Sequence, residues 1–319
     1  MSTQTIALSA LKPARSTDPR PAAPPPPPAA SAPAPELALG DEESAYRLHR
    51  RFDRMGRLVG DRGMARLFAS HAMVIGLGGV GSWAAESLAR SGVGRLTIVD
   101  FDLICVTNAN RQLHATRGTT GKPKAEVMAE RLRQINPRCQ VEAVRAFYSE
   151  ATSAELLGRA PDLVIDAIDN LRAKTHLIAA CRRAGLPLVV SGGASGRMDP
   201  TRIREADLNR AAGDPFLAAT RKLLRQHHDF PRGDERWGIP AIYSSEPAAD
   251  PLDLDYDGGQ GFRCVCPQGQ DSPHSCEHRN VIYGTASFVT GAFGLACAAA
   301  ATRLLLGDAL PRPVAPAAE

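Results

Sequence analysis

Residues 73–100 constrain the fold of this chain more than any other segment, because they hold the full pattern of a nucleotide-binding βαβ unit. A short apolar run at 72–75 predicts a buried strand, and the turn GLGGVG follows it directly. A helical pattern then extends to about Arg90, and a second apolar run at 96–99 ends on Asp100. Nucleotide-binding sheets use this order of strand, glycine-rich turn, helix, strand and acidic residue.

The glycines of the turn have separate expected tasks. Gly76 permits the tight turn, Gly78 lets backbone N–H groups approach a phosphate, and Gly81 lets helix and strand pack closely. The helix N-terminus adds a partial positive charge. Asp100 follows about twenty residues on, where a carboxylate accepts hydrogen bonds from ribose hydroxyls. The motif alone leaves open whether the nucleotide is NAD, FAD or ATP.

Strands and helices alternate through most of the remaining chain, which predicts an α/β fold with a doubly wound, mostly parallel, Rossmann-like sheet. Further strands are expected at 140–144, 162–168, 187–190, 201–206 and 239–243, and helices at 123–135, up to 184 and at 215–225. A C-terminal extension follows, with a long apolar helix.

Composition divides the chain into a central domain and two flanking segments. Residues 1–36 are rich in proline and alanine and are expected to be a disordered leader, because they cannot bury enough apolar surface to offset their ordering entropy. The domain spans 37–306, with a polar, mobile excursion at 247–280, and 307–319 is expected to be a disordered tail. Seven scattered cysteines fit a reducing cytoplasm. The net charge of +4 is compatible with an RNA partner without requiring one.

The apolar segment at 281–306 is long enough to cross a bilayer. Its alanines and glycines, however, suit close helix–helix packing. We therefore expect a buried helix at a subunit interface, with peripheral membrane association through 281–306 as the alternative.

Polar residues gather at strand ends and in the long segment 101–121, where a doubly wound sheet places its ligands. They are Asp102, Asn108, Arg111, Gln112, Lys124, Asp169 and Asn170. Two cations, Arg111 and Lys124, are expected to face solvent and to neutralise the phosphates of ATP, while one carboxylate holds Mg²⁺ and another the ribose. A hydride-transfer enzyme has no evident use for this cation pair, which disfavours an NAD-dependent oxidoreductase.

Several motifs resemble the ubiquitin-activating-enzyme-like adenylyltransferase superfamily: GLGGVGS, VDFD, TNANRQ, GKPKAE, INP and DAIDN. Over residues 45–306 the chain is most similar to one branch, the bacterial tRNA threonylcarbamoyladenosine dehydratases. The likeness to this branch lies in GSWAAE, VTNANRQ, KAEVMAERLRQINP, SGGASGRMDPT, the YSSE turn that ends at Glu246, and GTASFVTGAFG.

The resemblance implies ATP and Mg²⁺ as cofactors and assigns roles to individual residues. It places Gly78 and Gly79 in the phosphate loop, Asp100 on the ribose, and Asn108, Arg111 and Lys124 on the triphosphate. Further nucleotide-binding residues are expected at Gly76, Gly81, Asp102, Gln112 and Asn170. Asp169 matches the Mg²⁺-associated aspartate. Arg57, beside the expected helix break at Gly60, matches the arginine that reaches into the partner's ATP site in homodimeric members.

The implied reaction begins when a substrate carboxylate attacks the α-phosphate of ATP, giving an acyl-adenylate and pyrophosphate. In this branch the carboxylate belongs to threonylcarbamoyladenosine in tRNA, whose carbamoyl group then displaces AMP with net loss of water. The resemblance further implies a homodimer, a cysteine-desulfurase or sulfur-acceptor partner, and no DNA partner.

Cysteine spacing separates this interpretation from an activator of a ubiquitin-like sulfur carrier, the main alternative. The chain has no CxxC pair, and no cysteine lies between Cys181 and Cys264. This disfavours thioester or persulfide transfer in that region. A non-catalytic nucleotide-binding scaffold is disfavoured by the intact set of Arg111, Lys124 and Asp169. Whether Cys264, Cys266 and Cys276 bind metal with His274 and His278 stays open, because their spacing is irregular.

Overall fold

The computed structural model describes residues 50–254 and 283–310 and contains a seven-stranded sheet with strand order β3-β2-β1-β4-β5-β7-β6. The strands are β1 (His71–Ile75), β2 (Arg95–Val99), β3 (Gln140–Val144), β4 (Leu163–Asp166), β5 (Leu188–Ser191), β6 (Ile203–Asp207) and β7 (Pro240–Ser244). All neighbouring pairs are parallel except β6 and β7, so the antiparallel strand lies at one edge. The predicted doubly wound, mostly parallel sheet is confirmed.

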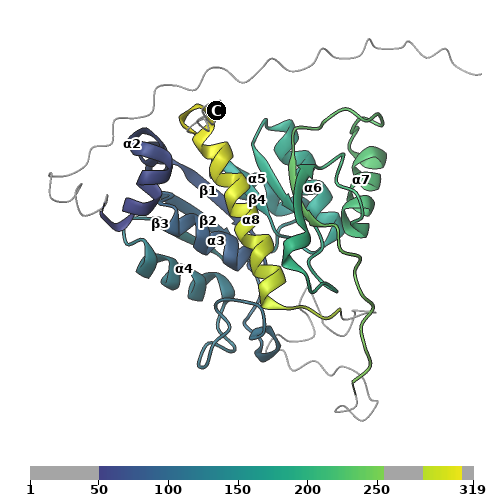
Figure 1. The fold of residues 1–319 in the computed structure, drawn as a ribbon, viewed down its shortest axis with the longest axis horizontal. Coiled ribbons are helices and arrows are strands. Elements are labelled where there is room, and N and C mark those ends of the chain that lie inside the picture. The colour runs from purple at the N-terminus through teal and green to yellow at the C-terminus, as the bar shows by residue number, and fades with distance from the viewer. Residues whose placement is uncertain (1–49, 255–282, 311–319) are drawn as a thin grey trace, which may run out of the picture. The chain divides into compact units, whose positions relative to one another are not determined.

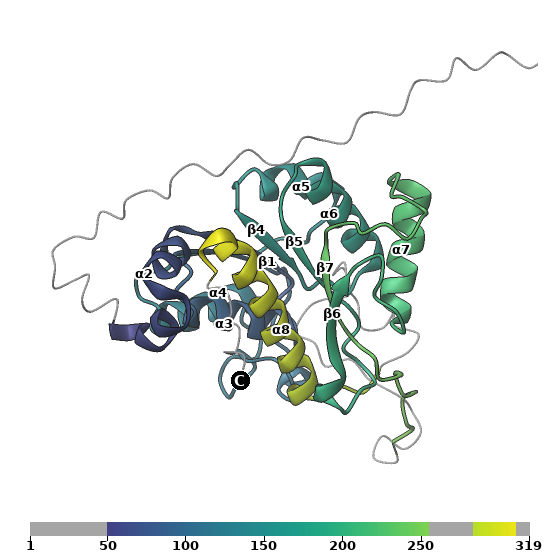
Figure 2. The same cartoon turned by 45° about the horizontal axis from the view of Figure 1, so that its top comes forward.

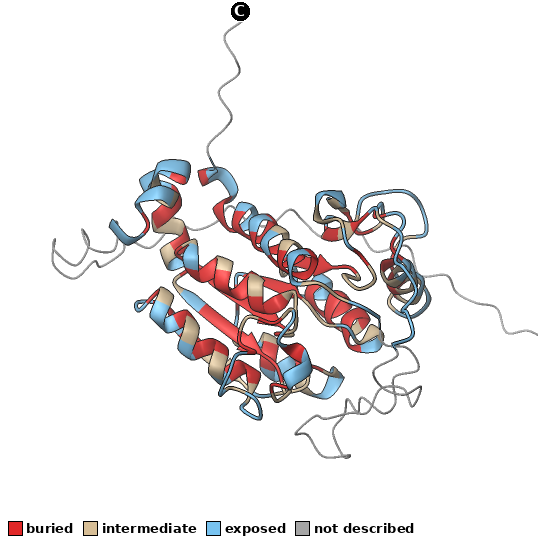
Figure 3. Cartoon of the chain, turned by 60° about the horizontal axis from the view of Figure 1, so that its bottom comes forward, coloured by how far each residue is buried: buried red, intermediate tan, exposed pale blue. Residues whose placement is uncertain are grey.

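Helices cover both faces of the sheet (Figures 1 and 2). They are α2 (Asp53–Ala69), α3 (Gly81–Arg90), α4 (Lys124–Ile135), α5 (Glu150–Leu157), α6 (Leu171–Arg183), α7 (Pro215–His227) and α8 (Ser287–Leu306). One apolar core joins α2, α3, α4 and α8 to the sheet, and a second joins α5, α6 and α7 to it. The central strands β1, β4 and β5 are buried along their whole length (Figure 3), as parallel strands between two helix layers must be.

Local capping explains where several elements begin and end. The strand expected at 162–168 spans Leu163–Asp166, and Asp166 turns the chain by accepting a hydrogen bond from the N–H of Ile168. Asn170 then caps α6 by accepting a hydrogen bond from the N–H of Ala173. Asp214 caps α7 in the same way, ahead of a proline at the first helical position. The break expected at Gly60 lies inside α2, where this residue has a φ of +72°.

Helix α8 is the long apolar helix expected near the C-terminus. The segment Ser287–Ala309 has the length and hydropathy of a membrane span, but 67% of its most apolar window is buried inside the protein. Its glycines face α3: a Cβ on Gly291 would lie 3.2 Å from the Trp83 ring, and one on Gly294 would lie 2.4 Å from the carbonyl oxygen of Val80. The small residues therefore serve helix–helix packing, and the predicted burial of this helix is confirmed.

Some expectations fall outside the described residues. They are the leader at 1–36, the part of the 247–280 excursion from 255 onwards, residues 311–319 of the tail, and the cluster of cysteines and histidines at 264–278.

Candidate active site

The glycine-rich loop leaves β1 and enters α3 with no room for side chains at two positions. Gly76 has a φ of +89°, and a Cβ there would lie 2.7 Å from the carbonyl oxygen of Ala167. A Cβ on Gly81 would lie 1.7 Å from the carbonyl oxygen of Gly76. At Gly78, by contrast, nothing among the described residues lies within 4 Å of the added atom. The loop is therefore packed at its ends and open at its middle, as a phosphate-binding loop requires.

The first turn of α8 packs directly on this loop. A Cβ added at Gly79 would lie 3.1 Å from Cβ of Thr290, whose own side chain is buried. Just before α8, the side-chain amide of Asn110 donates to the carbonyl oxygen of Thr285 at 2.9 Å. The glycine motif gave no indication of this contact, because about two hundred positions of sequence separate its two sides.

Asp100 ties the end of β2 to the phosphate loop. Its Oδ2 accepts a hydrogen bond from the backbone N–H of Leu77 at 2.6 Å, and its Oδ1 accepts one from the N–H of Asp102 at 2.8 Å. Burial raises the pKa of Asp100, an effect that the charge of Lys124 opposes. Each carboxylate oxygen has a second lone pair, so a ribose hydroxyl can still donate to Asp100.

Lys124 begins α4 and lies against two of these carboxylates. Its Nζ is 2.7 Å from Oδ2 of Asp102, and only 7% of its side chain is exposed. Burial alone would lower the pKa of Lys124, but Asp100 and Asp102 outweigh it and raise the pKa, so the ammonium stays charged. The expectation that Lys124 faces solvent was wrong, because the carboxylates at the end of β2 hold its side chain inward.

The segment after β2 positions the other polar residues expected at the site. Oδ1 of Asn108 accepts from the backbone N–H of Cys105 at 3.0 Å, so this side chain also shapes the turn. Arg111 is only partly exposed, and its Nη1 donates to the carbonyl oxygen of Thr107 and to Oδ1 of Asn110, both at 2.9 Å. The indole N–H of Trp83, on α3, donates to the carbonyl oxygen of Arg111 at 3.2 Å. This contact anchors the segment beside the phosphate loop.

Two buried polar side chains follow Arg111. Oε1 of Gln112 and both ring nitrogens of His114 have no hydrogen-bond partner among the described residues. Burial, and secondarily the charge of Lys124, lower the pKa of His114 to about 3. The ring is therefore neutral, with one donor and one acceptor near Lys124. The sequence predicts Gln112 at the site but does not single out His114, since a lone histidine in a polar segment carries no pattern.

Asp169 lies in a turn that is braced at both ends. Before it, Asp166 pairs with Lys174 at 2.7 Å without solvent exposure and accepts from the N–H of Ile168 at 3.0 Å. After it, Asn170 caps α6, which gives this residue a structural role in addition to the expected ligand role. Asp169 itself is exposed, and its charge helps to raise the pKa of Lys124. The structure thus brings Asp100, Lys124 and Asp169 to one edge of the sheet.

A segment that carries the branch-specific motif is braced after β5. The Nε of Arg197 donates to the carbonyl oxygen of Glu246 at 3.1 Å, while the carboxylate of Glu246 accepts from the N–H groups of Met198 and Asp199. The N–H of Gly196 donates to the carbonyl oxygen of Gly284 at 2.8 Å. The segment after β5 is thereby fixed to the residues that lead into α8.

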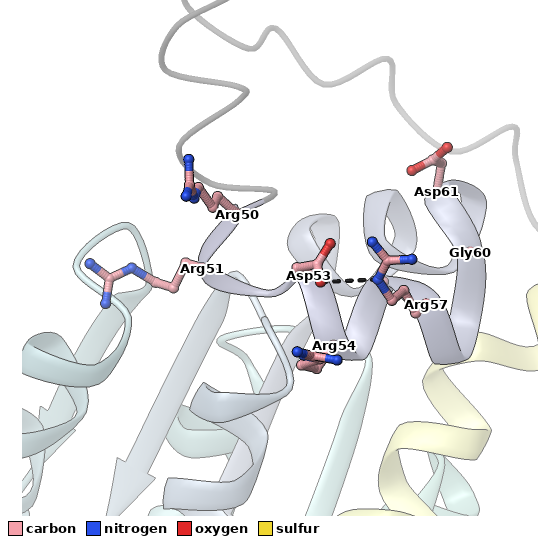
Figure 4. A pocket seen from close by; sticks show the side chains of 8 residues that line it. Arg50, Arg51, Asp53, Arg54, Arg57, Gly60 and Asp61 are labelled. Atoms are coloured by element: carbon pink, nitrogen blue, oxygen red, sulfur yellow. Dashed lines mark hydrogen bonds and ion pairs between the residues drawn. The ribbon is translucent and has the colours of Figure 1, made fainter.

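Arg57 is not brought to this edge in a single chain. It is exposed on α2 and pairs with Asp53 at 3.1 Å (Figure 4). Its neighbour Arg51 donates to the carbonyl oxygen of Ile135, the last residue of α4, while Lys124 is the first. A helix of this length separates the two ends by about 17 Å. The shallow pocket around Arg57 is lined by Arg50, Arg51, Asp53, Arg54, Gly56, Gly60 and Asp61.

Comparison with known proteins agrees with this architecture. The ThiF family matches residues 52–317. The tRNA threonylcarbamoyladenosine dehydratase of Haemophilus influenzae is 48% identical over 63% of this chain and 77% of its own length. That of Escherichia coli K12 is 39% identical over 81% of this chain and 94% of its own length. The crystal structure of the E. coli enzyme, TcdA, in complex with ATP superposes with a TM-score of 0.70 at 38% identity, covering 82% of this chain and 96% of that one.

The family match spans the phosphate loop, the residues Asp100, Asp102, Lys124 and Asp169, and α8, and the named relatives confirm the likeness to one branch. The chain belongs to the ThiF family and, within it, to the tRNA threonylcarbamoyladenosine dehydratases.

Proposed function

We propose that this chain cyclises threonylcarbamoyladenosine in tRNA with loss of water, using ATP to form an acyl-adenylate. The observation that carries this proposal is the cluster of Asp100, Asp102, Lys124 and Asp169 beside the open middle of the glycine-rich loop. The E. coli relative, whose structures contain ATP and AMP, supports ATP as the nucleotide.

Formation of the acyl-adenylate requires charged groups at fixed positions around ATP and does not require a nucleophilic side chain. A carboxylate is a poor electrophile because its leaving group would be oxide, whereas an acyl-adenylate expels AMP. The protein must hold two anions together and neutralise the charge that develops between them. Backbone N–H groups around Gly78, the start of α3 and the ammonium of Lys124 supply that field, and the partly exposed Arg111 adds a second cation.

Asp169 suits the expected Mg²⁺ role. It is exposed at the carboxyl edge of the sheet, and Mg²⁺ is commonly bound by one or two carboxylates together with substrate phosphates. The ion would neutralise charge on the triphosphate. Asp166 and Asn170 keep the turn in place on either side of Asp169.

A homodimer would complete the site. The outer side of α8 carries Phe288 and Leu295, each 50% exposed, with Ala292 and Ala299 between and after them at helical spacing. A second copy of the chain would cover this apolar stripe. Arg51, six residues before Arg57, contacts the end of α4 that is far from Lys124, so we expect Arg57 to act on the ATP site of the partner. Two-fold symmetry would then give two equivalent sites.

The remaining assignments rest on the family. A tRNA substrate and the scattered cysteines favour the cytoplasm, and the buried inner side of α8 favours this location over membrane association. A cysteine-desulfurase or sulfur-acceptor partner follows from the resemblance alone.

Nucleoside mass spectrometry tests the proposal. tRNA that carries threonylcarbamoyladenosine is incubated with the protein, ATP and Mg²⁺, then digested. We expect a nucleoside lighter by one water, together with AMP and pyrophosphate in equal amounts. If ATP is consumed only when a ubiquitin-like sulfur carrier is added, and the tRNA is unchanged, the alternative function is correct.

A further inference from the structure

An excess of positive charge lies at the C-terminal end of α6, on α7 and in the segment after α7. Residues 182–183 and 215–238 contain seven lysines and arginines and three carboxylates. This excess of four positive charges equals the net charge of the whole protein, so the remainder is balanced. We call the α7 basic surface the group formed by Arg182, Arg183, Lys222, Arg225, His228 and Arg232.

Aromatic rings fix part of this surface in place. The guanidinium of Arg182 lies over the ring of Phe230 at 4.3 Å, and that of Arg225 lies over Trp237 at 5.3 Å. The two rings meet edge to face at 4.7 Å. Both guanidinium groups are therefore held by cation–π contacts rather than free to move, which lowers the entropy cost of binding an anion.

The positive groups also crowd one another. Lys222 and Arg225 lie one turn apart on α7, next to the buried side that carries Leu224, and His228 follows directly after the helix. Burial and the positive charges of Arg183 and two neighbouring histidines lower the pKa of His228. Cations gathered with so few carboxylates are typical of a surface that binds a polyanion.

The location of the surface indicates a long ligand. Asp214, the cap before α7, accepts a hydrogen bond from the N–H of Gly193 at the carboxyl edge of the sheet, the edge that carries Asp169. Helix α7 ends thirteen residues after Asp214, about 20 Å away. ATP cannot reach from one to the other, whereas a nucleic-acid stem carries phosphates along that whole distance. Figures 1 and 2 place α7 at the opposite end of the sheet from α2.

We propose that the α7 basic surface binds the phosphate backbone of the tRNA whose modified adenosine enters the active site. This inference rests on the proposed function and adds the RNA-contacting residues. Contacts of this kind position the RNA without reading its sequence. An acidic protein partner is the competing occupant.

Binding of tRNA at several salt concentrations tests the proposal. The variant Arg183→Gln/Lys222→Gln/Arg232→Gln removes three exposed cations that make none of the cation–π contacts described above. The control Arg95→Gln/Arg133→Gln/Arg138→Gln removes three exposed cations near β3, at the opposite edge of the sheet. Circular dichroism establishes that both variants are folded, and the single substitutions replace any triple variant that is not.

We expect the first variant to bind tRNA at least tenfold more weakly than the control at physiological salt. Its plot of log affinity against log salt should flatten by about 0.9 for each phosphate that the protein no longer neutralises. Turnover at saturating tRNA and the KM for ATP should stay unchanged, because Lys222 lies about 12 Å along α7 from Asp214 and Arg183 is the last residue of α6, so neither is at the carboxyl edge that carries Asp169.

Equal affinity and equal salt slope in the two variants would overturn the proposal, leaving an acidic protein as the occupant to test. Failure of the proposed function is a separate result: the wild-type protein would then leave threonylcarbamoyladenosine unchanged, whatever the two variants bind.

Discussion

Lys174 and Asp166 form an ion pair that has no contact with solvent, with 2.7 Å between Nζ and Oδ2. Burial raises the pKa of Asp166, and Lys174 opposes that effect. We expect Lys174→Met to lower the free energy of unfolding by about 3–5 kcal/mol, because it leaves a carboxylate buried without a partner. Urea unfolding measures the change.

Replacing both members by apolar residues is the matched control. The double variant Lys174→Met/Asp166→Leu should recover at least half of the stability lost in the single variant, since no unpaired charge remains. It should still lose activity, because the turn that presents Asp169 loses the hydrogen bond that Asp166 accepts from Ile168. Equal stability of the single and double variants would contradict this account.

Lys124→Met should affect activity and stability together. Removing a cation that stabilises developing charge costs on the order of a hundredfold or more in rate. The substitution also leaves Asp100 and Asp102 without their buried counter-ion. Adding Asp102→Asn should restore part of the stability and none of the activity. Near-wild-type turnover of Lys124→Met at saturating ATP would remove this residue from the site.

Asp169→Asn should weaken the response to Mg²⁺. The amide keeps the shape of the exposed side chain and removes its charge, so half-saturation should need a higher Mg²⁺ concentration at the same melting temperature. Asp162→Asn, an exposed aspartate at the other end of β4, is the control. A magnesium titration that coincides with that of the control would assign Asp169 a different role.

His114 should make the protein sensitive to acid. The unfolded side chain titrates near pH 6.5 and the folded one near 3, so unfolding takes up a proton between these values and stability falls as the pH drops. Between pH 7 and pH 5 this residue accounts for a loss of about 2 kcal/mol. His114→Gln should flatten the dependence by that amount, as measured by urea unfolding at pH 7 and pH 5.

Mixing two inactive variants tests whether the site is shared between subunits. Arg57→Ala and Lys124→Ala should each be inactive, while a hybrid dimer has one intact site. With free exchange, half of the dimers are hybrids, so activity should return to about a quarter of wild type. No recovery after demonstrated exchange would place the action of Arg57 within its own subunit.

The sequence predicts the fold and the phosphate loop well, because both depend on local patterns. Gly76 and Gly81 lie where a Cβ would collide with backbone carbonyl oxygens, as the spacing of the motif indicates. Apolar runs between helices likewise predict buried parallel strands. The ends of helices depend on side chains such as Asn170, which caps α6, so the apolar pattern does not fix them.

Long-range contacts account for the features that the sequence does not reveal. A charged residue such as Lys174 resembles a surface residue until the turn between β4 and α6 places Asp166 beside it. Lys124 was expected in solvent because its burial depends on Asp102, which belongs to another element. The α7 basic surface was not predicted for the same reason. It forms only when Arg182 and Arg225, from different helices, lie over the rings of Phe230 and Trp237, which contact each other.

The contact between Gly79 and Thr290 has a consequence for the synthesis of the protein on the ribosome. The phosphate loop emerges early during synthesis, yet its outer wall is the first turn of α8, one of the last helices to be made. A chain still on the ribosome therefore carries the complete glycine motif but not the finished site. The apolar side of α3 stays uncovered until α8 has been synthesised. Closing so distant a contact is slow, which exposes that surface to chaperones and to self-association during translation. Premature termination before residue 287 should thus yield an aggregation-prone fragment rather than a weak enzyme.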